Sequence, residues 1–303
     1  MIKPTTVIEQ ALYSTVRIEA EFSNGEDSTG TGFIFDFKLS VPGETKPFII
    51  PCVVTNNHVV AGCERVRFRF HTSSSDGSEP TGEQRLFVDS KPEWIRHPDE
   101  RTDLCAYMLG RAVISRGLVG PLFYRGFVEA FIWRDDKLED LDAIEEVVMV
   151  GYPNGLWDSV HNYPLLRRGT TATHPAIDHC GVPEGIVDMA ACPGSSGSPI
   201  LIMNQGAYIQ KSGVIGLGGR ESRVVLLGVL HEWATLDIEG EMRRASVPVS
   251  AKKAPFVPSG LHLGYYIKAK QLLILGEAVK SAFIGDAEKL TAASSNLKQT
   301  TSR

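Results

Sequence analysis

The chain has 303 residues, of which 43% are hydrophobic and 22% are charged, as in an ordinary globular protein that buries a core without metal or disulfide support. Its formal net charge of −5 argues against a dedicated nucleic-acid-binding protein, which normally presents a basic face. The sequence contains no apolar run of the roughly 20 residues that a membrane-spanning helix needs.

The N-terminal segment and the cysteines predict a cytoplasmic protein. The segment MIKPTTVIEQALYSTVRIEAEF lacks the charged and then apolar pattern of a secretory signal, because Glu9, Gln10 and Arg17 interrupt it. The odd number of cysteines and the absence of a CxxC motif argue against a disulfide framework and favour a reducing compartment. The cysteines, which we expect to be free thiols, are Cys52, Cys63, Cys105, Cys180 and Cys192.

Short stretches rich in Val, Ile and Phe, with turn residues between them, predict many β-strands. A first series covers residues 13–22, 30–37, 48–55, 65–70, 85–90 and 103–109. A second covers residues 127–133, 146–152, 165–173, 185–190, 198–204, 223–233 and 263–269. Strands of this length and spacing are typical of an all-β barrel or sandwich. The strict alternation of RVRFRF, residues 65–70, predicts one buried face and one solvated face.

The two strand series predict two similar halves. We expect an N-terminal half over residues 10–115, a C-terminal half over 116–285 and a linker near 111–123. Helix is scarce: KAKQLLILGEAVKSAF, residues 268–283, predicts a terminal amphipathic helix, and PTTVIEQAL predicts a short one. The polar tail over 286–303 is expected to be disordered. The acidic residues 135–146 lack the ligand pattern of a calcium loop and favour a solvated turn.

The stretch CPGSSGSPI, residues 192–200, sets three serines in a frame of glycine and proline. A serine hydroxyl is a weak nucleophile until a base takes its proton, and the usual base is a histidine oriented by a carboxylate. Two strand ends supply these groups. His58 lies in VVTNNHVVAG, and Asp103 opens the strand in ERTDLCAYML. With Ser196, they occur in the chain order His, Asp, Ser.

In the segments around His58, Asp103 and Ser196 the chain resembles the trypsin-like (chymotrypsin-fold) serine proteases. Among these, it most resembles the bacterial branch that includes the HtrA and Deg proteases. VVTNNHVV and TDLCAYML resemble that branch's segments around the catalytic histidine and aspartate, and PGSSGSPI resembles its PGNSGGPL block. STGTGFIF resembles its GSGF strand, and VGYPNGL resembles a glycine-proline turn. The chain order is that of chymotrypsin, and neither that of subtilisin nor that of the α/β-hydrolases. The resemblance runs from about residue 13 to about residue 280, and we expect no PDZ module.

The resemblance implies an all-β fold of two six-stranded antiparallel β-barrels with a C-terminal helix. It makes Ser196 the nucleophile, His58 the general base and Asp103 the carboxylate that orients His58. The backbone N–H groups of Gly194 and Ser196 would form the oxyanion hole. Gly194 suits this role because glycine adopts backbone angles that other residues avoid.

The chain departs from the resembled family just before the nucleophile. Trypsin-type zymogens carry an aspartate there, which pairs with a new N-terminal amine after cleavage, whereas this chain has the uncharged Ser195 and no IVGG-like start. We therefore expect an oxyanion hole that is already formed, or one ordered by neighbouring loops or a partner. Ser198 replaces the family's second glycine, and Cys192 has no later cysteine with which to pair.

Specificity is expected to depend on a pocket between residues 190–194 and the strand segment GVLHEW. Ala190 would lie at its base, close to Asp188 and Met189, and His231, Glu232 and Trp233 would form one wall. Because the residue at the floor of this pocket would be uncharged, we expect no strict preference for Arg or Lys before the scissile bond, and a small or apolar side chain is favoured there.

The sequence thus predicts a serine endopeptidase that acts on a protein or peptide substrate through an acyl-enzyme, without a metal or another cofactor. Cys180, His174 and His179 are close in sequence, but their spacing fits no zinc motif. We expect no nucleic-acid or membrane partner, and a regulatory protein partner stays open. Two alternatives remain: a non-catalytic peptide-binding module on the same fold, and a narrowly selective processing protease or esterase.

Overall fold

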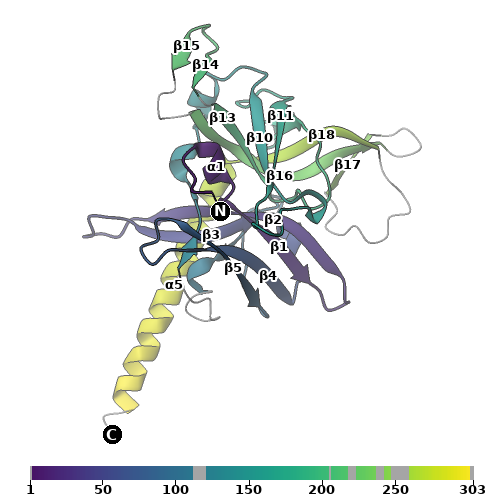
Figure 1. Cartoon of the computed structure of the whole chain (residues 1–303). Helices are drawn as coiled ribbons and strands as arrows, with labels where there is room; N and C mark the ends of the chain where they lie inside the picture. The colour runs from purple at the N-terminus through teal and green to yellow at the C-terminus, as the bar shows by residue number, and fades with distance from the viewer. Residues whose placement is uncertain are drawn as a thin grey trace.

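The computed structural model describes residues 2–111, 121–204, 206–217, 223–236, 242–246 and 259–300. These residues form two large β-sheets, stacked one above the other in Figure 1, and a long C-terminal helix. The prediction of an all-β fold with a C-terminal helix is therefore confirmed.

The first sheet is built from the N-terminal part of the chain, in the order β5-β4-β1-β2-β3-β7-β6. Its strands are β1 (Thr15–Glu21), β2 (Asp27–Leu39), β3 (Phe48–Thr55), β4 (Arg65–Ser73), β5 (Pro80–Asp89), β6 (Ile95–Arg96) and β7 (Cys105–Met108). In β4, Val66, Phe68 and Phe70 are buried, as the alternating pattern predicts. Within the described residues no backbone ladder joins β5 to β7. Tyr107 Oη instead donates a hydrogen bond to Asp89 Oδ2 at 2.8 Å, which links the two strands through side chains.

The second sheet closes into a barrel. Its strands are β10 (Glu146–Gly151), β11 (Leu165–Thr171), β12 (Glu184–Asp188), β13 (Pro199–Asn204), β16 (Arg223–Leu236), β17 (Met242–Ser246) and β18 (Ser259–Lys268). They follow the order β13-β10-β11-β12-β18-β16-β17, and β13 also pairs with β16, which completes a ring of six antiparallel strands. A separate ribbon of β14 (Ala207–Ile209) and β15 (Ile215–Leu217) projects at the top of Figure 1.

The chain leaves the first sheet later than residue 115. Two short strands follow, β8 (Leu122–Phe123) and β9 (Phe127–Val128). β8 pairs antiparallel with β4, and β9 pairs parallel with β2. Both belong to the first sheet by hydrogen bonding, although the sequence places residues 127–133 in the second series. We therefore propose that the boundary between the halves lies between Val128 and Glu146. Most of the predicted linker, residues 112–120, falls outside the described residues.

The described short helices lie before the first strand and in the connections between later strands. The predicted N-terminal helix is α1 (Val7–Ala11), which begins with a capping box between Thr6 and Glu9. One turn of helix, α2 (Asn57–Val60), follows β3, and α4 (Asp135–Leu138) lies in the acidic segment. The 3₁₀ turns are η1 (Glu129–Phe131), η2 (Pro153–Gly155) and η3 (His179–Gly181).

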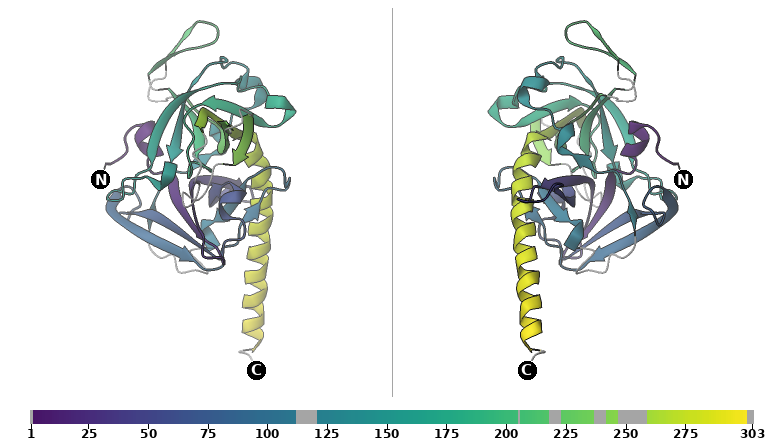
Figure 2. Two further views of the ribbon diagram at one scale, coloured as in Figure 1. Left: turned by 90° about the vertical axis from the view of Figure 1, so that its right-hand side faces the viewer. Right: turned by 90° about the vertical axis from the view of Figure 1, so that its left-hand side faces the viewer.

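The C-terminal helix α5 (Lys270–Thr300) runs along the side of the first sheet and extends beyond it (Figure 2). It continues to Thr300, into the segment where we expected a disordered tail, and this part of the chain contains three Ala, two Leu and two Lys residues, which favour helix. None of the helices in the described part of the chain is long and apolar enough to span a membrane.

Three hydrophobic clusters hold the fold together. One fills the first sheet and one fills the second barrel. The third joins the two sheets, with Phe33 and Phe35 of β2 on one side and Val148 and Val150 of β10 on the other. Residues of α5 complete this third cluster, namely Leu272, Leu275 and Val279. The helix therefore seals the contact between the two sheets.

Replacing Leu272 with alanine is expected to lower the free energy of unfolding by about 2–5 kcal/mol, because the side chain is fully buried in the third cluster. The matched control is Leu273→Ala one position along the helix, where the side chain is 41% exposed. This control should change stability by no more than about 0.5 kcal/mol. Urea unfolding followed by circular dichroism measures both, and equal losses for the two variants would contradict the proposed sealing role of α5.

Candidate active site

His58 and Asp103 meet because of the register of two neighbouring strands. β3 and β7 pair antiparallel, with Thr55 at the end of β3 opposite Cys105 at the start of β7. His58 follows Thr55 by three residues, and Asp103 precedes Cys105 by two. Both side chains therefore emerge at the same end of the first sheet.

Asp103 holds His58 through two hydrogen bonds. Its Oδ1 accepts the backbone N–H of His58 at 2.9 Å, and its Oδ2 lies 2.5 Å from His58 Nδ1. Asn56 strengthens the arrangement, because its Nδ2 donates to the Asp103 carbonyl at 2.9 Å. With Nδ1 facing the carboxylate, the other ring nitrogen of His58 is oriented outward as a base.

Ser196 lies at that second nitrogen. Its Oγ is 3.0 Å from His58 Nε2, within hydrogen-bond reach. The serine belongs to a turn between Pro193 and the start of β13, anchored to β16 by a hydrogen bond from the Gly197 N–H to the Leu230 carbonyl at 2.9 Å. The structure thus brings His58, Asp103 and Ser196 together across the junction of the two sheets.

Two glycines let the turn adopt this shape. Gly194 and Gly197 have φ of +84° and +83°, a region that side chains with a Cβ rarely adopt. A Cβ on Gly194 would lie 2.7 Å from the Tyr152 carbonyl oxygen, and one on Gly197 would overlap the Thr31 carbonyl oxygen. Any side chain at either position would therefore displace the turn that carries Ser196.

The peptide bond between Pro193 and Gly194 has a defined direction. The Pro193 carbonyl accepts a hydrogen bond from the N–H of Asn154, a residue in η2 with φ of +52°. The described chain contains no cis peptide bond, so the Gly194 N–H points opposite to this carbonyl, away from Asn154. Within the described residues, the Gly194 N–H has no protein acceptor.

Neighbouring polar groups do not compete with Ser196 as nucleophiles. Cys105 is fully buried, and this burial, reinforced by the charge of Asp103, raises the pKa of its thiol well above the ordinary value. Ser195 and Ser198 are as buried as Ser196, but neither hydroxyl bonds to His58: Ser195 Oγ accepts the Cys192 N–H, and Ser198 Oγ has no hydrogen-bond partner. No group of three or more His, Cys, Asp or Glu side chains that could hold a metal occurs among the described residues.

The residues expected to form a substrate pocket lie on two elements beside the nucleophile turn. Ala190 is half-buried between β12 and the turn, and Trp233 of β16 is half-buried against the core of the second barrel. His231 lies in an irregularity of the pairing between β16 and β18 and is buried, with its Nε2 3.3 Å from Glu184 Oε1. This contact lacks hydrogen-bond geometry, so His231 Nε2 is a buried nitrogen without a hydrogen-bond partner among the described residues.

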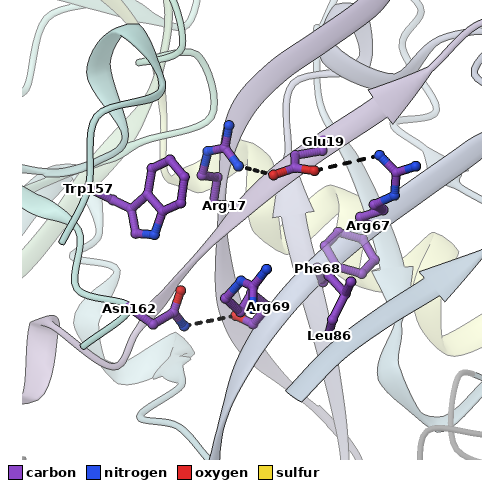
Figure 3. Close-up of a pocket in the computed structure, with 8 residues that line it drawn as sticks. All are labelled: Arg17, Glu19, Arg67, Phe68, Arg69, Leu86, Trp157 and Asn162. Atoms are coloured by element: carbon purple, nitrogen blue, oxygen red, sulfur yellow. Dashed lines mark hydrogen bonds and ion pairs between the residues drawn. The ribbon is translucent and has the colours of Figure 1, made fainter. Parts of the chain in front are cut away.

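Figure 3 shows a small pocket on the outer face of β1 and β4, lined by arginines and Trp157. Glu19 lies between Arg17 and Arg67 and forms ion pairs with both, and the Arg17 guanidinium stacks 4.1 Å from the centre of the Trp157 ring. The pocket has a volume of about 10 Å³, which leaves room for no more than one water molecule. We therefore interpret this cluster as a structural clamp that holds the chain after η2 against β1.

Three residues that the sequence analysis did not single out take part in the site: Thr31, Asn56 and Asn154. Asn56 directly precedes the pair Asn57 and His58, and a polar residue at the end of an apolar strand could have signalled its role. Asn154 lies in a Pro-Asn-Gly turn, a sequence that favours positive φ. Thr31 stands between two glycines inside a strand, where only a contact partner distant in sequence reveals its importance.

No protein-family model matches the sequence, and no curated protein matches it. Among solved structures, the HtrA-type protease AlgW with tripeptide is 17% identical, with a TM-score of 0.45, over 90% of this chain and 62% of AlgW. The MamO protease domain from Magnetospirillum magneticum (apo form) is 15% identical, with a TM-score of 0.41, over 80% of this chain and 95% of that domain.

The Rv3671c protease from M. tuberculosis (active form) is 15% identical, with a TM-score of 0.40, over 89% of this chain and 82% of that protein. The chain thus spans 62% of AlgW but most of the other two. At these identities and scores, the function has to be inferred from the geometry of the site itself.

Proposed function

We propose that the protein is a serine endopeptidase that works through an acyl-enzyme. The observation that carries this proposal is the position of His58, whose Nδ1 faces Asp103 and whose Nε2 lies 3.0 Å from Ser196 Oγ. A histidine bridged between a carboxylate and a serine hydroxyl is the arrangement that activates serine as a nucleophile.

In the first half of the reaction, Ser196 Oγ forms a bond to the substrate carbonyl carbon as His58 Nε2 takes its proton. Asp103 stabilises the imidazolium that results. The negative charge on the substrate oxygen is stabilised by the backbone N–H groups of Gly194 and Ser196. His58 then gives its proton to the leaving amine as the carbon–nitrogen bond breaks, and the acyl group stays on Ser196.

In the second half, water replaces the amine. His58 takes a proton from this water, whose oxygen bonds to the acyl carbon, and then returns the proton to Ser196 Oγ as the ester bond breaks. The products are the carboxylic acid and the free serine. His58 thus serves as base and acid in both halves, and the chemistry requires neither a metal nor another cofactor.

We propose that the side chain before the scissile bond enters a pocket formed by Ala190, His231 and Trp233. The small, uncharged Ala190 offers no carboxylate to a lysine or arginine. A small or apolar side chain suits such a pocket. The substrate would be a protein or peptide.

The five cysteines, all of them free, support a reducing compartment such as the cytoplasm as the place of action. Two of them, Cys52 and Cys105, are fully buried, and burial raises the pKa of both thiols. We therefore propose that the protein works as a cytoplasmic enzyme whose fold does not depend on disulfides.

The function is tested by incubating the purified protein with a mixture of unstructured peptides and following the products by mass spectrometry. We expect cleavage at internal peptide bonds that phenylmethylsulfonyl fluoride stops, whereas EDTA and the thiol reagent iodoacetamide leave the rate unchanged. Intact peptides in the presence of folded protein would contradict the proposal. Cleavage that stops with EDTA or iodoacetamide, but not with the sulfonyl fluoride, would do so as well.

A further inference from the structure

One buried residue outside the triad, Thr31 of β2, connects the parts of the site. Its side chain is fully buried, and it makes four hydrogen bonds to segments distant in sequence. Its N–H donates to the Ser196 carbonyl at 2.9 Å, and its Oγ1 donates to the Gly194 carbonyl at 3.0 Å. The same Oγ1 accepts the Tyr152 N–H at 3.0 Å, so the hydroxyl is satisfied both as donor and as acceptor.

Hydrogen bonds hold the two peptide groups on either side of Gly194. In the group before it, the Pro193 carbonyl accepts from the Asn154 N–H. In the group after it, the carbonyl of Gly194 itself accepts from the Thr31 hydroxyl. Thr31 also anchors Tyr152, which directly precedes the η2 turn that contains Asn154. Thr31 therefore acts on the direction of the Gly194 N–H indirectly, through the neighbouring peptide group and through Tyr152 and η2.

Thr31 is itself fixed to β3, the strand that leads into the helical turn with His58. Its carbonyl accepts a hydrogen bond from Thr55 Oγ1 at 2.7 Å, and Thr55 ends β3 just before His58. Gly197 packs so closely on this carbonyl that a Cβ would overlap it. The turn that carries Ser196 and the end of β3 before His58 thus share one buried contact point, the Thr31 carbonyl.

The residue before Ser196 carries no charge that could hold the turn in place through an ion pair, because it is Ser195. Ser195 is fully buried, and its Oγ accepts only a long bond from the Cys192 N–H at 3.4 Å. We propose that Thr31 is a positioning residue whose hydroxyl keeps the Pro193–Ser196 turn in the form that directs the Gly194 N–H at the reacting oxygen. This inference rests on the proposed function, because it assigns Thr31 to the oxyanion hole of that reaction. The hole is then formed in the resting protein, without an activating ion pair.

The test compares Thr31→Val, which removes the hydroxyl at nearly constant volume, with Thr31→Ser, which keeps it. The matched control is Thr15→Val, because Thr15 is also buried in the first sheet but its Oγ1 has no hydrogen-bond partner. The readouts are the second-order rate of labelling by a fluorophosphonate probe, kcat and KM on a peptide ester, and the melting temperature.

We expect Thr31→Val to lower kcat and the labelling rate by about 100-fold, the size of effect found when an oxyanion contact is lost, with KM changed less than about 2-fold. Thr31→Ser and Thr15→Val should stay within about 3-fold of the unmodified protein. If Thr31→Val does not fold, Thr31→Ala removes the same hydroxyl without pressing a methyl group on the two freed polar groups, and the same loss is expected.

The inference is overturned if the valine or alanine variant is labelled at the original rate, even with a lower melting temperature, since Thr31 would then be structural only. It is also overturned if KM rises while kcat is unchanged. A folded, unmodified protein that never reacts with the probe would instead refute the proposed function, so the two failures are distinguishable.

Discussion

Replacing Ser196 with alanine is expected to lower kcat for peptide hydrolysis by about six orders of magnitude. The substitution removes Ser196 Oγ, the atom that would form the acyl bond. His58 Nε2, which lies 3.0 Å from this oxygen in the unmodified protein, then has no serine hydroxyl to deprotonate. The small rate that remains comes from binding and from oxyanion stabilisation of a direct attack by water. Steady-state rates of amide-bond cleavage in a peptide substrate, with enzyme concentrations raised for the variant, measure the loss.

The matched control for this prediction is Ser198→Ala, two residues further along the same turn. Ser198 is equally buried, but its Oγ has no hydrogen-bond partner, so its loss should change kcat by less than about 3-fold. If Ser196→Ala keeps more than about 1% of the activity, or if Ser198→Ala loses as much, Ser196 is not the nucleophile.

Replacing Asp103 with asparagine is expected to lower kcat near neutral pH by about four orders of magnitude. An asparagine amide can donate to His58 Nδ1, which places the ring proton on Nε2, the atom that must accept the proton of Ser196. The variant loses in addition the negative charge that stabilises the imidazolium. KM should change little, because Asp103 is not expected to touch the substrate.

Asp99→Asn is the control for this substitution, since Asp99 lies on the same loop but pairs with Arg101 at the surface. It should leave kcat within about 3-fold, because exposed ion pairs contribute little to the fold. An Asp103→Asn variant whose kcat falls less than about 10-fold would show that the carboxylate does not orient His58 as proposed.

The strand pattern follows from local periodicity in the sequence, and the segments around His58, Asp103 and Ser196 could be picked out by their order in the chain and by their resemblance to a known family. RVRFRF in β4 alternates with the strand period, and the glycines around Ser196 match backbone angles that only glycine adopts readily. His58 and Asp103 could be placed at strand ends, and the pairing of β3 with β7 brings those ends together.

The features that could not be predicted depend on contacts between distant segments. The short strands β8 and β9 carry too few residues for a periodic signal, and only their partners β4 and β2 define them. Nothing local marks Thr31 as more than a strand residue, because its importance comes from bonds to Tyr152, Gly194 and Ser196. The length of α5 was underestimated because a polar sequence rich in good helix formers can continue a helix that packing has already started.

The activation of Ser196 as a nucleophile is tested most directly by treating the folded, unmodified protein with a fluorophosphonate probe and locating the adduct by mass spectrometry. We expect one adduct per chain, on the peptide that contains Ser196, and no adduct in protein unfolded by urea before treatment. A folded protein that stays unlabelled, or one labelled at a different residue, would contradict this expectation.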